Sequence, residues 1–116
     1  MSYVDGFVVP VPKKNLDAYR ELATLARDVW KEYGALDYRE WIADDVPMGE
    51  ITSFPRSVQQ KDDEIVIFSW IVYRSREHRD EVNAKVMADP RMKSSPETYP
   101  FDAKRMIYGG FAPFVE

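Results

Sequence analysis

Cysteine is absent from this chain of 116 residues, and histidine occurs only once, as His78. The absence of cysteine excludes disulfide frameworks, thiolate metal sites and cysteine nucleophiles. With a single histidine, only carboxylates remain as further metal ligands, so we expect no metal site built by the protein and no cofactor. Haem with His78 as its axial ligand is the alternative. Any chemistry is therefore sought among carboxylates, hydroxyls and aromatic rings.

Positive charge is also scarce. The chain has 16 Lys and Arg against 20 Asp and Glu, which gives a net charge of −4, and neither half is basic. Surfaces that bind nucleic acid usually carry a clustered surplus of lysine and arginine, so we expect no nucleic-acid partner. No apolar run approaches the roughly 20 residues that span a bilayer, and no secretory leader is visible. We expect a cytoplasmic protein that has no membrane partner.

Aromatic residues, by contrast, are plentiful. Tryptophan, tyrosine and phenylalanine together make up 14% of the chain, and hydrophobic residues make up 45%. A chain of this length buries about two thirds of the surface that its unfolded form exposes, which is enough for one hydrophobic core. We therefore expect one folded domain over residues 1–116.

Hydrophobic periodicity predicts alternating strands and helices. The predicted strands cover residues 3–11, 36–43, 65–73 and 105–115, with a short edge strand at 50–54. One predicted helix follows Asn15, a candidate N-cap, and ends at Gly34; the other is residues 76–88, capped by Ser75, with His78, Val82, Val86 and Met87 facing inward. The order β-α-β-β-α-β is the ferredoxin-like plan of the α+β class, an antiparallel four-stranded sheet with both helices on one face.

The strand at 65–73 is apolar on both of its faces. Val66, Phe68, Trp70 and Val72 point one way, and Ile65, Ile67, Ile71 and Tyr73 point the other way. An antiparallel sheet that is covered by helices on one side only would alternate apolar and polar residues. Because the chain has no further helix to cover the second face, we expect a homodimer in which two sheets pack together.

Five blocks of sequence carry a family likeness. They are residues 3–9 (YVDGFVV), 45–47 (DVP), 68–71 (FSWI), 89–93 (DPRMK) and 100–111 (PFDAKRMIYGGF). With these blocks the chain resembles the bacterial YbaA-like family of unknown function. The resemblance implies the dimeric α/β-barrel superfamily, which includes cofactor-independent monooxygenases, haem-degrading enzymes, muconolactone isomerases and stress-related proteins. It implies a fold more strongly than an activity, and it maps no catalytic residue onto this chain.

Three residues are candidates for proton transfer. Asp5 and Glu40 are carboxylates within predicted strands, where each is either paired or placed in an enclosed site that favours its protonated form. The structural alternative for both is an ion pair across strands, with Arg39 or Arg105. His78, in the first turn of its helix, is held neutral by the helix dipole and is then available as a base; the alternative is a solvated residue at the boundary.

The candidate ligand-binding residues are aromatic. They are Trp70, Tyr108, Tyr38 and Trp41, all on predicted strands. Such rings either pack a core or line a mainly apolar pocket. The sequence thus predicts a dimer that binds a small molecule in the barrel interior, in the manner of a cofactor-free monooxygenase or isomerase. The alternative is a non-catalytic structural or stress-related dimer.

Overall fold

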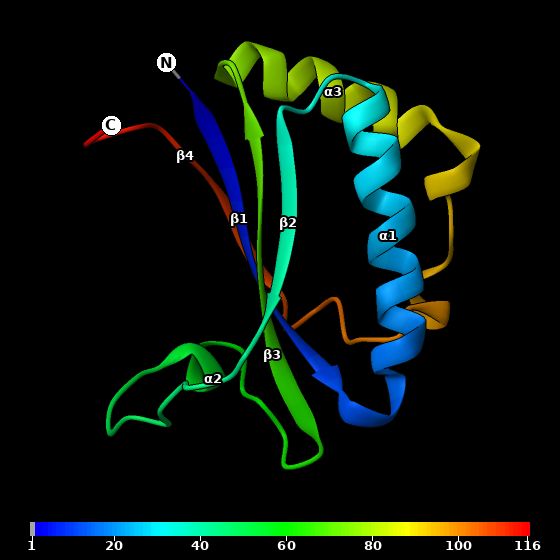
Figure 1. The fold of residues 1–116 in the computed structure, drawn as a ribbon. Helices are drawn as coiled ribbons and strands as arrows, with labels where there is room; N and C mark the ends of the chain where they lie inside the picture. Colours follow the sequence, from blue (N-terminus) through cyan, green and yellow to red (C-terminus); the bar gives the residue numbers. More distant parts are fainter. Residues whose placement is uncertain (1) are drawn as a thin grey trace.

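The computed structural model describes residues 2–116 as an α+β fold with a four-stranded antiparallel sheet and three helices (Figure 1). The strands are β1 (Tyr3–Pro12), β2 (Asp37–Ile42), β3 (Glu64–Tyr73) and β4 (Ile107–Phe111). The helices are α1 (Leu16–Glu32), α2 (Phe54–Ser57) and α3 (Arg76–Ala88). In the sheet the strands follow the order β2-β3-β1-β4, so β2 and β4 form the two edges.

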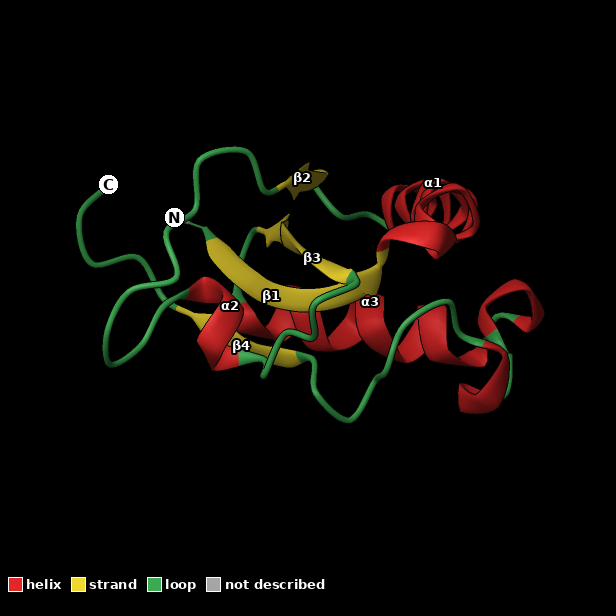
Figure 2. Ribbon diagram, turned by 90° about the horizontal axis from the view of Figure 1, so that it is seen from below, coloured by secondary structure: helices red, strands yellow, loops and turns green. Residues whose placement is uncertain are grey.

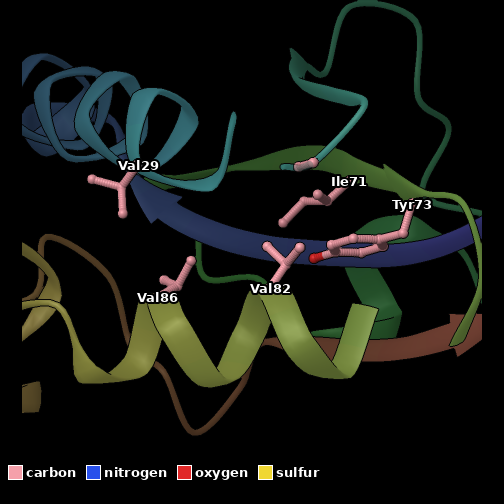
Figure 3. Packing of buried hydrophobic residues seen from close by; sticks show 6 residues of the cluster. Val29, Ile71, Tyr73, Val82 and Val86 are labelled. Carbon is pink, nitrogen blue, oxygen red and sulfur yellow. The ribbon is translucent and has the colours of Figure 1, made fainter. Parts of the chain in front are cut away.

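Helices α1 and α3 pack on the same face of the sheet. Val29 of α1 and Val82 and Val86 of α3 are buried in one cluster with Ile71 and Tyr73 of β3. Figure 3 shows Val82 and Val86 pointing from α3 toward the sheet. Burying an aliphatic side chain of this size stabilises the fold by roughly 1.5–3 kcal/mol. This cluster therefore fixes α3 against the centre of the sheet.

The opposite face of the sheet is only partly covered. Helix α2 lies apart from α1 and α3 in Figure 1 and apart from α1 in Figure 2. Val58, just after α2, is buried against Val8 and Val66. Beyond this cover, Trp41, Phe68, Ile107 and Phe111 remain 38–63% exposed. The prediction that β3 is apolar on both faces is confirmed, since Ile67 and Ile71 are buried on the helix side. We call the partly uncovered side the open face.

Local signals place two of the helix ends correctly. The Ser75 hydroxyl accepts a hydrogen bond from the His78 backbone N–H at 3.0 Å, as a Ser cap of α3 requires. Gly34 follows α1 with φ of +115°, a conformation that side chains other than glycine rarely adopt. Asn15 occupies the predicted N-cap position of α1, but its side chain makes no capping hydrogen bond, and a 3-10 turn over Lys13–Asn15 leads directly into the helix. The Asn15 amide instead donates to the Pro100 carbonyl at 3.1 Å.

Three other expectations are corrected. Residues 50–54 form no strand; Ser53 accepts from the Arg56 backbone N–H and so begins the short helix α2, where Pro55 suits the first turn. The last strand is shorter than predicted, because Arg105 lies before β4 and contacts other side chains. Met87 is 60% exposed and does not belong to the buried stripe of α3.

Candidate functional site

A cleft of about 480 Å³ lies between α1 and β2, which run side by side in Figure 1. One side is a single face of α1, from Leu16 to Arg27, and the other is the edge strand β2 over residues 38–42. Clefts of this size accommodate small organic ligands. Glu40, Tyr38 and Trp41, which the sequence singled out separately, all line it.

The Glu40 carboxylate is held by two tyrosines in this cleft. The Tyr19 hydroxyl donates to Oε1 at 2.5 Å, and the Tyr38 hydroxyl donates to Oε2 at 2.7 Å. Tyr38 and Glu40 share a face of β2 because side chains alternate along a strand, whereas Tyr19 reaches across from α1. Burial, together with the Glu40 charge, raises the pKa of both phenols far above the usual range. Both tyrosines therefore remain neutral hydrogen-bond donors.

Three arginines line the same cleft as this carboxylate. Arg20, Arg27 and Arg39 line the cleft, in which Glu40 is the only acidic residue. Arg27 contacts Asp28 at 3.1 Å and Arg39 contacts Asp37 at 3.1 Å, both in exposed pairs. Within residues 2–116, Arg20 forms no ion pair. Among the residues that line the cleft, three are therefore positively charged and one is negatively charged.

Asp5 lies elsewhere, on the helix side of β1. Its Oδ1 atom is 2.6 Å from the Arg79 guanidinium of α3, and only 8% of its side chain is exposed. The same guanidinium lies over the Tyr3 ring, with 5.1 Å between Cζ and the ring centroid. Burial raises the Asp5 pKa, although Arg79 opposes this effect. The predicted partners, Arg39 and Arg105, are wrong; the ion pair joins a strand to a helix.

His78 is buried, which confirms its predicted inward position on α3 and contradicts the alternative of a solvated boundary residue. Its Nδ1 atom accepts a hydrogen bond from the Arg74 backbone N–H at 3.0 Å, and its ring packs edge-on against Tyr73. Burial, followed by the nearby Arg74 charge, lowers the His78 pKa. His78 therefore packs the first turn of α3 against β3. It does not line the α1–β2 cleft.

The remaining aromatic candidates separate into two places. Trp70 lies on the open face, where its ring centroid is 5.3 Å from that of Trp41. Tyr108 stacks on Phe7 at 6.2 Å at the β4 edge and is 72% exposed. Neither residue lines the α1–β2 cleft. Trp41 also borders a second, apolar hollow of about 200 Å³ beside Phe54 and Phe68.

Sequence reasoning missed the α1 side of the cleft. Tyr19, Arg20 and Arg27 line it, and none of them is among the residues that the sequence indicates as candidates. The available signal was spacing: Arg20 and Arg27 are seven residues apart, so they share a helix face about 10 Å apart along the axis. Which strand this face meets depends on packing, which the spacing does not reveal.

Within residues 2–116, no three His, Asp or Glu side chains are grouped so that they could hold a metal ion. None of the helices in these residues has both the length and the apolar character needed to cross a membrane.

Comparison with known proteins identifies relatives of the same length. A model of the family "Protein of unknown function (DUF1428)" matches residues 2–103. The uncharacterized protein YbaA of Escherichia coli (strain K12) is 53% identical over 116 residues, which cover 100% of this chain and 99% of that protein. The uncharacterized protein YbaA of Shigella flexneri matches with the same identity and coverage. Among solved structures, the de novo designed protein Foldit4 aligns over 96% of this chain and 94% of its own, with 6% identity and a TM-score of 0.45.

Proposed function

Because the chain belongs to the DUF1428 family of proteins of unknown function, we propose a function from its own geometry: it binds a small organic molecule in the α1–β2 cleft, and Glu40 accepts a proton from that molecule. One observation carries the proposal. The Glu40 carboxylate lines a cleft of about 480 Å³, with each of its oxygens positioned by a neutral tyrosine hydroxyl. A carboxylate fixed in this way is oriented before the ligand arrives.

The reaction that suits this arrangement is a proton shift within the ligand. Glu40 takes a proton from the carbon between a carbonyl group and a carbon–carbon double bond, the electron pair moves onto the carbonyl oxygen as a dienolate, and the proton returns at the far carbon of the double bond, which thereby moves into conjugation with the carbonyl group. Nothing is oxidised or reduced, so no co-reactant is required. The arginines that line the cleft supply positive charge to stabilise the enolate oxygen. Of the activities that the resemblance implies, this chemistry corresponds to the isomerase type.

Deuterium exchange tests the role of Glu40. In D2O, the protein should accelerate the loss of the C–H proton signals of levulinate next to its ketone, measured by proton NMR. Glu40→Gln should slow this exchange by roughly 100-fold or more, since general-base catalysis contributes at least that much. Glu21→Gln, an exposed change on α1 outside the cleft, is the matched control and should exchange at the wild-type rate. Equal rates for Glu40→Gln and wild type would reject the proposal.

We also propose that the protein forms a homodimer in which the sheets of two ferredoxin-like domains together form an α/β barrel. It is supported by the strand order β2-β3-β1-β4, by α1 and α3 on one face, and by the exposed aromatic rings of the other face. On that face Gly6 lies between Trp70 of β3 and Gly109 of β4. The Phe111 ring lies over both glycines, since its Cε1 atom is 3.7 Å from the position that a Cβ atom would take on each of them, and it adds to the apolar surface of this face. A second copy covering this face removes the apolar patch from water.

Oligomeric state tests the dimer. Phe68 is 38% exposed on the open face and packs against Phe54 and Trp70. In light scattering coupled to gel filtration, we expect a wild-type dimer at micromolar concentration. Phe68→Asp should yield a monomer, because it buries an unpaired charge in the interface. Met87→Asp, an equally radical change on the exposed side of α3, should remain dimeric. A wild-type monomer would overturn this part of the proposal.

A non-catalytic dimer is the second candidate. It is favoured by the fact that both Glu40 oxygens already have hydrogen-bond donors within the chain, so this group could simply tie α1 to β2. Such a protein would leave levulinate exchange at the buffer rate while still forming the dimer.

A further inference from the structure

The charge of the α1–β2 cleft opposes that of the whole chain. The protein has a net charge of −4, yet its cleft is lined by three arginines and one glutamate. Arginine presents a planar fork of donors that matches a carboxylate or another oxyanion. A local surplus of guanidinium groups in an acidic protein therefore indicates that the ligand of the cleft is an anion.

Two of these arginines define one side of the cleft. Arg20 and Arg27 share a face of α1, about two helical turns apart. Between them lie Ala23 and Thr24, whose small side chains leave space above the helix. Arg20 forms no ion pair within residues 2–116, and the Arg27–Asp28 pair is exposed, at 50% and 61% of the two side chains. An exposed pair between neighbours is weak, so an incoming anion could replace it.

The rest of the cleft is suited to an apolar body. Leu16, Ile42 and Ile67 contribute aliphatic surface, and Trp41 adds an aromatic ring. The Tyr19 and Tyr38 hydroxyls point to Glu40, so each phenol donor is already used. The charged donors of the cleft are the guanidinium groups of its three arginines.

From this arrangement we propose that the ligand of the cleft is an organic carboxylate, with its anion on Arg20 and Arg27 of α1 and its apolar part against β2. The proposal rests on the proposed function in that it concerns the same cleft, and it names the class of ligand. The anion is attracted to the arginines and repelled by Glu40. It therefore binds on the α1 side, and the remainder of the molecule extends toward the Glu40 carboxylate.

Benzoate and benzamide provide a matched pair of probes, since they share a ring and differ in charge. Binding would be followed by amide chemical shifts of residues 16–27 and 37–42 in the full-length protein. Benzoate should bind at least tenfold more tightly than benzamide, and its affinity should fall as salt is added. Arg20→Gln and Arg27→Gln should each weaken benzoate about tenfold, the effect of losing a charge-assisted hydrogen bond. Arg76→Gln, on the exposed side of α3, should leave the affinity unchanged.

Glu40→Gln distinguishes the proposal of a carboxylate ligand from the proposal of proton transfer by Glu40, on which it rests. Because it removes a like charge, it should bind benzoate as tightly as wild type or more tightly, although it no longer exchanges levulinate protons. Equal affinities for benzoate and benzamide, with exchange of levulinate no faster than that of neutral 2-pentanone, would overturn the carboxylate assignment. In that event the Glu40 result would still decide the proton-transfer proposal on its own.

Discussion

Replacing Arg79 by methionine should lower the free energy of unfolding by about 3–5 kcal/mol at neutral pH. Arg79 is the partner of Asp5, at 2.6 Å, and their side chains are only 18% and 8% exposed. Methionine preserves much of the apolar stem but removes the charge, so the Asp5 carboxylate is left buried without a counter-ion. Urea unfolding at a fixed protein concentration measures the loss.

The pH dependence distinguishes this cause from lost packing. Burial already raises the Asp5 pKa above its ordinary 3.8, and Arg79 opposes the rise. A carboxyl with a raised folded-state pKa binds more protons when folded than when unfolded, so its contribution to stability falls as pH increases through that value. Without Arg79 the pKa rises further. The destabilisation of Arg79→Met should therefore be largest near neutral pH and should shrink as the medium is acidified toward the unfolded-state value.

Two variants serve as controls for this prediction. Asp5→Asn combined with Arg79→Met removes both charges and should recover a large part of the stability that Arg79→Met loses. Arg76→Met, one turn earlier on the exposed side of α3, should change stability little. If Arg79→Met is equally destabilising at acidic and neutral pH, the uncompensated Asp5 charge is not the cause.

The contrast between Asp5 and β3 illustrates what sequence can predict about this fold. Alternation along residues 65–73 correctly separates Phe68 and Trp70 from Ile67 and Ile71, because a strand's period of two determines which side chains share a face. The same reasoning places Asp5 on one face of β1 without revealing its partner. That partner, Arg79, is 74 residues away in the chain, and the contact depends on how α3 is rotated on the sheet.

The candidate site was predictable on its strand side only. Tyr38, Glu40 and Trp41 were selected as polar or aromatic residues of one strand, and the cleft contains all three. The contact between Tyr19 and Glu40 could not be predicted from the sequence, because the angle between α1 and β2 follows from packing of the whole core. The strand predicted at residues 50–54 was wrong for a different reason. Their apolar pattern suits a strand, but the Ser53 cap and Pro55 together favour a helical turn.

Arg105→Met should also lower the free energy of unfolding by about 3–5 kcal/mol at neutral pH, although the carboxyl that loses its partner here has a lowered pKa in the wild-type protein, whereas the Asp5 pKa is raised. Arg105 contacts both oxygens of Glu64, at 2.7 and 2.6 Å, and the Glu64 side chain is only 3% exposed. It also contacts Asp102 at 3.0 Å, so it joins the start of β3 to the loop before β4. Removing its charge leaves the buried Glu64 carboxylate without a counter-ion and breaks the contact that holds this loop to β3.

Hydrogen bonds from Arg105 hold the Glu64 pKa below its ordinary 4.5, even though burial opposes the effect. A carboxyl with a lowered folded-state pKa stabilises the fold above its unfolded-state pKa, and this contribution disappears as pH falls through the folded-state value. The free energy of unfolding of the wild-type protein should therefore increase as pH rises from the acidic range. In Arg105→Met the part of this increase that comes from Glu64 should be absent. Lys104→Met, an exposed change at the adjacent position, should keep the wild-type profile. Unfolding curves across the acidic range measure the difference, and parallel profiles for Arg105→Met and wild type would refute the role assigned to this ion pair.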